Sequence, residues 1–295
     1  LAGLSAGMLL IGAGAGTSPP SGIVMITTKI SLKRRNTAFA FHEIGPNLAM
    51  LTVPLFVILL EPWFGWRGVL YWMAAISGLS ALAFLRWGAP DSGMGTAPNL
   101  RTLSVILRER KTLLGMLILS AALAGIQGVY AILPAYLVTE YGLESRYVNI
   151  LLSLSRITGV ILLMRTESLI NRFGRRRTIM GVLLFSSVFT ALIGIVKGPL
   201  ISVVVVLQPA LLTLVFPPLL SSIADIGEFR YQNLTYAVVI TVGVSLGSGV
   251  APALLGISGD LGLGWLGFIL LALYMSLAVF FLRATPDFGL GHGRE

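Results

Sequence analysis

The sequence predicts an all-α integral membrane protein, a helical bundle built from two halves that repeat one another. The chain of 295 residues is 56% hydrophobic and only 11% charged, whereas a soluble domain has about 25% charged residues. Much of its surface must therefore face lipid. Its apolar runs are 17–27 residues long and lack the strict alternation of a barrel strand, which indicates membrane-spanning helices.

The third observation that predicts this fold class is a weak internal repeat at a spacing of 198 residues. Pro19-Pro20 recurs as Pro217-Pro218 at this spacing, and Gly45, Ala49 and Pro54 are matched in the same way by Gly243, Gly247 and Pro252. One residue beyond this spacing, the corner Gly65-Trp66-Arg67-Gly68 is matched by Gly264-Trp265-Leu266-Gly267. The region 10–70 is thus echoed at 208–269. In a membrane chain, a weak internal repeat indicates a secondary transporter.

Nine spans are predicted, at about 4–30, 37–60, 67–85, 113–138, 148–164, 178–196, 200–223, 235–255 and 264–282. If the loop after the first span is cytoplasmic, seventeen of the 21 Lys and Arg residues lie on the cytoplasmic side, three lie outside, and Arg156 lies within a span. Because positively charged loops stay in the cytoplasm, this asymmetry predicts the orientation. We expect a multi-pass protein of the inner (plasma) membrane with a cytoplasmic C-terminus.

The repeat also predicts the division of the chain. Spans one to three match spans seven to nine, whereas spans four to six have no upstream counterpart. Since the chain starts at Leu1, we expect a fragment of a twelve-helix protein that lacks three N-terminal helices and does not transport alone. The predicted units are the second half of an N-terminal six-helix bundle (1–86), a cytoplasmic linker (87–112), a C-terminal six-helix bundle (113–283) and a cytoplasmic tail (284–295). The linker is expected to end in a short amphipathic helix or a disordered tether.

Composition and motifs exclude several classes of function. The chain has no cysteine and only two histidines, which excludes disulfides, thiol catalysis and a metal cluster. It has no phosphate-binding Gly-x-x-x-x-Gly-Lys loop, no His-Glu-x-x-His motif and no serine elbow, so we expect no cofactor and no enzymatic activity. The net charge of +9 is distributed over the predicted cytoplasmic loops, which predicts a topology signal and no nucleic-acid partner.

The loop between the fifth and sixth spans carries the clearest motif. Residues 167–176, Glu-Ser-Leu-Ile-Asn-Arg-Phe-Gly-Arg-Arg, resemble the Gly-x-Leu-Ala-Asp-Arg-x-Gly-Arg-Arg loop of the major facilitator superfamily, with Glu167 in place of Gly and Asn171 in place of Asp. The glycine permits a tight turn, and the arginines can hold helix-end carbonyls and acids of a neighbouring helix. The resemblance predicts a gating loop formed by Arg172, Gly174, Arg175 and Arg176.

Other stretches are similar to the fourth to seventh helices of the same family: Gly12 to Gly16 with Pro19-Pro20, the frame Gly45 to Pro54, Trp66-Arg67, and Tyr130 to Tyr141. Met8 stands where the family's fourth helix often has Arg. The resemblance implies that the spans are helices four to twelve of a monomeric secondary transporter. Such a protein moves a small molecule by alternating access, and its partners are the substrate, a coupling ion and the lipid bilayer.

Arg156 is the first candidate site residue because it lies about 12 Å from either end of its span. A charge at that depth must face a cavity or a partner. Arg156 is therefore expected either to bind an anionic substrate or to pair with an internal acid. Glu43, about 9 Å into the second span, is the candidate acid, and we hypothesise a Glu43–Arg156 contact that is broken or protonated during transport. His42 is a weaker candidate for a proton relay.

Further candidates for substrate binding or coupling are Gln127, Tyr130, Asn149 and Gln208, although packing is the more common role for each. Small residues spaced by four favour close packing of membrane helices, and prolines favour bends. The residues expected to pack or bend helices are Pro19, Pro20, Gly45, Pro54, Pro217, Pro218, Gly243, Gly247 and Pro252.

The predicted function is secondary active transport of a small anionic or zwitterionic organic solute, driven by a proton gradient. The predicted preference for an anionic solute depends on Arg156. The predicted proton coupling depends on a desolvated carboxylate that can be protonated. Two alternatives remain open at this point: proton-driven multidrug efflux, and a non-transporting membrane receptor or scaffold on the same fold.

Overall fold

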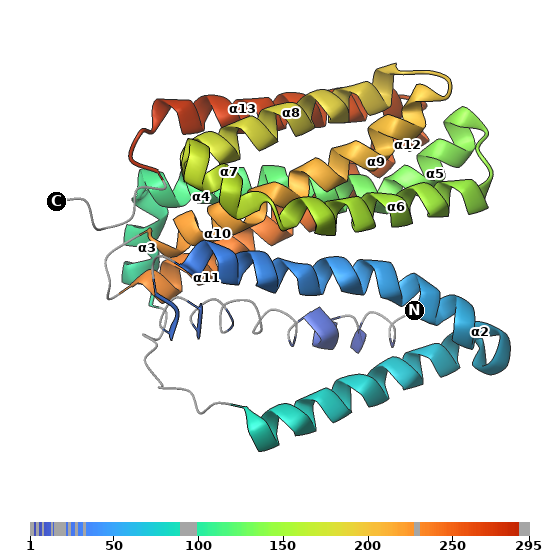
Figure 1. Ribbon diagram of the computed structural model, residues 1–295, viewed down its shortest axis with the longest axis horizontal. Coiled ribbons are helices and arrows are strands. Elements are labelled where there is room, and N and C mark those ends of the chain that lie inside the picture. Colours follow the sequence, from blue (N-terminus) through green and yellow to red (C-terminus); the bar gives the residue numbers. More distant parts are fainter. Residues whose placement is uncertain are drawn as a thin grey trace.

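The computed structural model describes residues 34–88, 99–226 and 231–288, together with single positions between 3 and 31. Every regular element among these residues is helical, which confirms the predicted all-α class (Figure 1). Most of the predicted first span, including Pro19 and Pro20, lies outside the described residues, as do 89–98 of the predicted linker and 289–295 of the predicted tail.

The helices follow one another with short connections. In chain order they are α2 (Arg35–Trp87), α3 (Leu100–Arg108), α4 (Arg110–Leu123), η2 (Ala124–Gly128), α5 (Val129–Tyr141), α6 (Ser145–Leu163), α7 (Thr166–Phe173), α8 (Arg175–Ile195), α9 (Leu200–Leu212), η3 (Thr213–Val215), α10 (Phe216–Ala224), α11 (Gln232–Val244), η4 (Ser245–Val250), α12 (Ala251–Asp260) and α13 (Gly264–Ala284). Here η2 and η4 are π-helical and η3 is a 3₁₀ segment. α4 to α5, α9 to α10 and α11 to α12 each form one continuous rod.

Within the described residues, seven helices are long and apolar enough to cross a membrane, whereas we predicted nine spans. The seven are Leu59–Trp87, Arg110–Tyr141, Ser145–Leu163, Arg175–Ile195, Leu200–Ala224, Leu234–Asp260 and Gly264–Ala284. They correspond to the third to ninth predicted spans. The predicted span 37–60 is helical and forms the first arm of α2, but several of its side chains lie outside the described set.

α2 is a hairpin of two helices joined at Gly65. This residue has φ 63° and ψ 174°, a non-helical conformation that glycine adopts without the steric penalty of a Cβ. The turn falls within the predicted corner Gly65-Trp66-Arg67-Gly68. The first arm lies along the bundle, and the second arm diverges from it (Figure 1). Only 6% of the Leu59–Trp87 window is buried, so this arm presents its apolar side chains outward.

The core of the protein lies in the rest of the chain. The rods Arg110–Tyr141 and Leu200–Ala224 are the most enclosed, with 72% and 67% of their apolar windows buried. α13 packs along α8, α6 along α9, and α11 along α4. The first arm of α2 contacts α10 and α6 and adds Phe39, fully buried, to the same hydrophobic cluster.

The rod formed by α11 and η4 packs closely against α4 and η2, and glycines make this crossing possible. A Cβ on Gly247 would lie 2.6 Å from both the Leu123 Cβ and the Ser120 carbonyl oxygen, and one on Gly243 would lie 2.7 Å from the side chain of Leu119. Pro252 follows η4 in the first turn of α12, where its missing N–H permits the wider π turn before it. Gly243, Gly247 and Pro252 thus lie at a helix crossing.

The remaining candidate bend residues differ from one another. Pro217 and Pro218 are the second and third residues of α10, which follows the 3₁₀ segment η3, so the rod changes its winding there. In the described part of the chain, no atom outside the nearby backbone of its own helix lies within 4 Å of the position that a Cβ on Gly45 would take. The backbone of α2 is helical at Pro54, whose side chain lies outside the described set.

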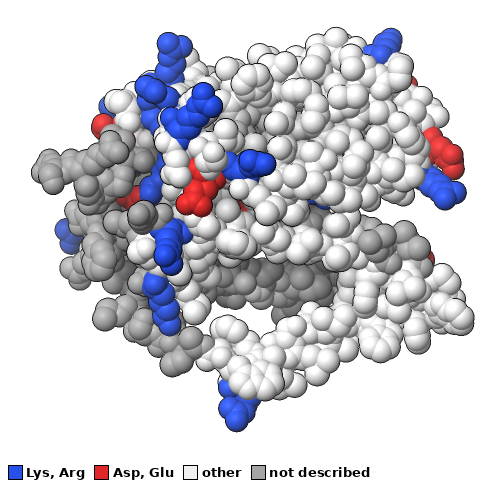
Figure 2. Space-filling view, viewed as in Figure 1, with Lys and Arg blue, Asp and Glu red and all other residues white. Residues whose placement is uncertain are grey.

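The end of the predicted linker is a short helix, α3, which is one of the two expected alternatives. Asn99 caps it by accepting a hydrogen bond from the Thr102 amide at 2.7 Å. Ile106 is buried, whereas Val105 is 60% exposed. Lys and Arg side chains gather on this side of the molecule, at the left of Figure 2, and a broad uncharged band separates them from the charges at the opposite end. We call the side that carries α3, the α7–α8 turn and the first residue of α2 the basic end.

A Gly247→Ala substitution is expected to lower the free energy of unfolding by about 1–3 kcal/mol, because the new methyl group must displace α4. Gly249→Ala, in the same π segment, is the matched control, since a Cβ there meets nothing within 4 Å and alanine favours a helix by up to about 1 kcal/mol. Thermal unfolding in detergent measures both variants. Equal midpoints for the two would show that the crossing does not depend on Gly247.

Candidate functional site

The first candidate site is a buried cation in the middle of α6. Arg156 is 2% exposed and is the largest fully buried side chain of the described residues. Its guanidinium carbon lies 4.3 Å from the centroid of the Tyr130 ring on α5, close enough for a cation–π interaction. The structure therefore brings together two of the predicted site residues.

Part of the Arg156 guanidinium has no hydrogen-bond partner in the part of the chain that the structure describes. Its Nε and Nη2 atoms are buried without a hydrogen-bond acceptor, and among the described residues no carboxylate forms an ion pair with it. Removing a charge from water without a compensating partner is strongly unfavourable. Nε and Nη2 lie on the same edge of the planar group, the edge that binds a carboxylate through two parallel hydrogen bonds.

A third predicted site residue, Gln208, makes polar contacts within the core. Gln208 of α9 is fully buried, and its Nε2 donates to the Gly125 carbonyl of η2 at 2.8 Å and to the Thr190 Oγ1 of α8 at 2.9 Å. A side chain that donates a hydrogen bond to a helix carbonyl can interrupt the regular backbone hydrogen bonding of that helix. Here the carbonyl belongs to η2, the π-helical segment just before Tyr130. Gln208 therefore ties three helices together, and the structure does not bring it to Arg156.

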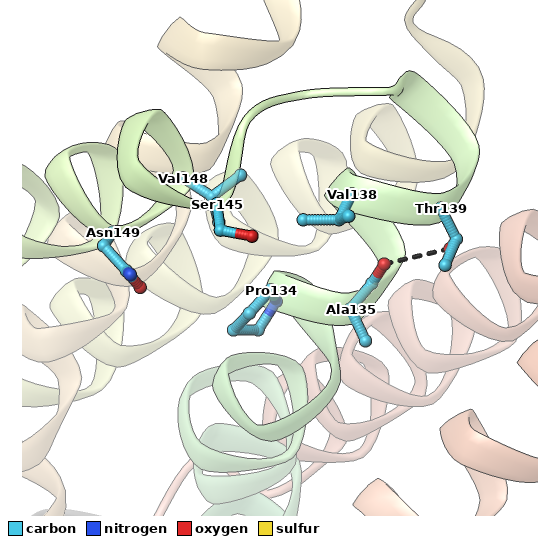
Figure 3. A pocket seen from close by; sticks show the side chains of 7 residues that line it. All are labelled: Pro134, Ala135, Val138, Thr139, Ser145, Val148 and Asn149. Carbon is cyan, nitrogen blue, oxygen red and sulfur yellow. Dashed lines mark hydrogen bonds between the residues drawn. The ribbon is translucent and has the colours of Figure 1, made fainter.

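The other two polar candidates occupy different places. Gln127 is half-buried in η2. Asn149 is exposed on α6, two turns before Arg156, and lines a pocket with residues of α5 (Figure 3). Asn149 thus shares the helix of Arg156, at the end nearer to the α5–α6 turn.

Glu43 lies on the first arm of α2, with its side chain 12% exposed. One of its carboxylate oxygens is 3.4 Å from the Nδ1 of His42. In the described residues no ion pair joins Glu43 to Arg156. The hypothesised contact between them is therefore not formed in this structure.

The second candidate site is an ion-pair cluster at the basic end. Asp225, the C-cap of α10, accepts from the Nη1 of Arg35 at 2.9 Å and from the Nη1 of Arg175 at 2.6 Å. Arg35 and Arg175 are the first residues of α2 and α8. All three side chains are at most 16% exposed, so one carboxylate joins the starts of two helices to the end of a third.

The predicted gating loop supplies one arginine of this cluster. Gly174, with φ 80°, separates α7 from α8. Arg176 donates to the carbonyls of Leu282 and Arg283 at the end of α13, at 3.1 and 2.8 Å, where the helix dipole favours a cation. Arg172 is exposed, and its guanidinium carbon lies 5.3 Å from the Phe173 ring centroid.

Sequence reasoning missed Asp225. The available signal was its position, because it is one of few acids among the many basic residues of the predicted cytoplasmic side. An acidic residue at the cytoplasmic end of a predicted span is close to several arginines with which it can form ion pairs.

The chain was also compared with known proteins. The family model described as Major Facilitator Superfamily matches residues 1–252. No curated protein matches the chain.

An Asp225→Asn substitution is expected to open the basic end. Because the chain has no cysteine, a single Phe39→Cys, one turn after Arg35 and fully buried in the native residue, reports access by its rate of maleimide labelling. Loss of a charged hydrogen bond worth about 1.5 kcal/mol corresponds to about tenfold faster labelling.

The control for this experiment is Asp260→Asn, at the opposite end of the bundle, which should leave the labelling rate of Phe39→Cys unchanged. If Asp225→Asn and Asp260→Asn give the same rate as the single-cysteine parent, the cluster does not hold the basic end closed.

Proposed function

Because the chain belongs to the Major Facilitator Superfamily, a family of membrane transporters of small molecules, we propose that it carries an organic anion by proton-coupled alternating access. The observation that carries this proposal is Arg156, a buried cation with two unpartnered donors on one edge. Organic carboxylates, including zwitterions, are the substrates that this edge fits best.

The chemistry of the Arg156 edge favours a carboxylate over a neutral or cationic solute. A carboxylate would accept from Nε and Nη2 at once, which satisfies two buried donors and neutralises the charge. Tyr130, stacked on the guanidinium, would keep its plane fixed while the edge is filled. A cation would be repelled by Arg156, so this site argues against multidrug efflux of cationic compounds.

The cluster at the basic end supports the alternating-access part of the proposal. We assign α2 to one bundle (1–86) and α8 and α10 to the other (113–283), joined by the linker 87–112 and followed by the tail 284–295. The pairing of Arg35 and Arg175 with Asp225 would then hold the two bundles together on one side of the membrane. With the basic end in the cytoplasm, as positively charged loops favour, this conformation is closed to the cytoplasm.

Glu43 is the proposed proton acceptor. It lies on the arm of α2 that packs against α10 and α6, between the proposed bundles, and it is mostly shielded from solvent. Protonation would neutralise a charge whose desolvation opposes closer packing of the two bundles. The charge of Glu43 would thereby couple the closing movement to the proton gradient.

The Arg156 proposal predicts a large loss of anion transport in Arg156→Gln. Removing one partner of a buried charged contact weakens binding by at least about 2 kcal/mol, or about thirtyfold. Uptake of radiolabelled carboxylates is measured in proteoliposomes that carry the full-length protein. Arg156→Lys should retain part of the activity because it keeps the charge and loses the two-donor edge.

Arg146→Gln, at an exposed position on the same helix, is the matched control and should transport like the wild type. Undiminished carboxylate uptake in Arg156→Gln would falsify the anion site. Transport of cationic drugs with no response to carboxylates would favour efflux, and a protein that moves neither class would favour the receptor or scaffold alternative.

A Glu43→Gln substitution is expected to abolish the acceleration of uptake by an imposed pH gradient. Exchange of labelled for unlabelled substrate should persist, because exchange requires no net proton movement. His42→Gln, its neighbour in sequence, should keep the response to the gradient. If Glu43→Gln still responds to the gradient and His42→Gln does not, then His42 carries the proton.

A further inference from the structure

A pocket of about 380 Å³ lies between α5 and α6, near the turn that joins them. Its walls come from two helices: Pro134, Ala135, Val138 and Thr139 of α5, and Ser145, Val148 and Asn149 of α6. In Figure 3 the seven lining side chains approach one another from the two helices on either side of this turn. The volume is within the range of pockets that bind small molecules.

The pocket lies on the same two helices that carry Tyr130 and Arg156. Pro134 follows Tyr130 by four residues and Asn149 precedes Arg156 by seven, so each pocket residue lies on the same helix face as its partner in the cation site. At 1.5 Å per residue the separations along the helices are about 6 Å and about 10 Å. A ligand anchored on Arg156 therefore reaches the pocket if it extends along α5 and α6.

The walls of the pocket are mainly apolar. Pro134, Ala135, Val138 and Val148 supply hydrocarbon surface. The hydroxyl of Thr139 is already used, since it donates to the Ala135 carbonyl at 2.9 Å (Figure 3). Ser145 and the exposed Asn149 add polar groups at the rim. Such walls favour the hydrocarbon part of a ligand and give a second charged group no partner.

We propose that this pocket is a substrate subsite that takes the aliphatic tail of a monocarboxylate whose carboxylate group is bound by Arg156. The inference rests on the proposed function and narrows its substrate class from organic anions to amphipathic monocarboxylates. Dicarboxylates are disfavoured because the described lining contains no basic residue.

The test is displacement of radiolabelled hexanoate from the purified full-length protein by unlabelled carboxylates from acetate to octanoate. Each methylene buried in the pocket should strengthen binding by about two- to fourfold. Val138→Trp, which fills the pocket from a partly exposed position, should flatten this dependence on chain length. Ile150→Trp, on the exposed face of α6, is the matched control and should keep the full dependence.

Val138→Ala provides a second variant if the tryptophan disturbs folding, and its enlarged pocket should shift the preference to longer or branched acids. Equal dependence on chain length in the wild type and in both Val138 variants would overturn the subsite, because the tail would then be in lipid or detergent. No chain-length dependence, with binding still lost in Arg156→Gln, would overturn the subsite and leave the anion site standing. Binding that is indifferent to Arg156→Gln, or absent for every acid, would overturn the proposed function itself.

Discussion

The burial of one positive charge in an apolar bundle is the constraint on which the rest of this structure depends. In a chain with 11% charged residues, Arg156 is 2% exposed and lies midway along a membrane helix. The ring of Tyr130 compensates one face of the guanidinium, and the edge formed by Nε and Nη2 has no acceptor among the described residues. An arrangement that leaves a buried cation partly unsatisfied is unfavourable for stability alone. It becomes understandable if an anion completes the site for part of a transport cycle.

The surrounding helices hold this arrangement through contacts of two kinds. In the core, the amide of Gln208 takes the carbonyl of Gly125 and fixes the π-helical segment that precedes Tyr130. Gly247 then allows a second π segment to cross at van der Waals distance. At the basic end, Asp225 joins Arg35 and Arg175 and sets how the first arm of α2 meets the remaining helices. The core is thus held by packing, whereas the basic end is held by ion pairs.

Properties that depend on the chain's local pattern could be predicted from the sequence. The apolar runs gave the all-α class and the positions of the seven spans, and the order of residues around Gly174 gave the α7–α8 turn with Arg176 on helix-end carbonyls. The depth of Arg156 within its span identified the buried cation. Each of these follows from residues that are close together in the chain.

Contacts between distant segments could not be predicted in the same way. Asp225 pairs with residues 190 and 50 positions away, and Gln208 was expected among the substrate-binding or coupling residues, whereas its amide serves the backbone of η2. Glu43 and Arg156 have similar predicted depths, but similar depth does not make two helices present the same faces to each other. Helix rotation about its own axis, which the hydrophobic pattern of a nearly uniform apolar helix leaves undetermined, decides these contacts.

The most direct test of the account is an experimental structure of the full-length protein with a monocarboxylate bound. Carboxylate oxygens are expected about 3 Å from both Nε and Nη2 of Arg156, with Tyr130 still against the guanidinium. A carboxylate bound elsewhere, with Arg156 paired to an acidic side chain of the protein, would contradict it.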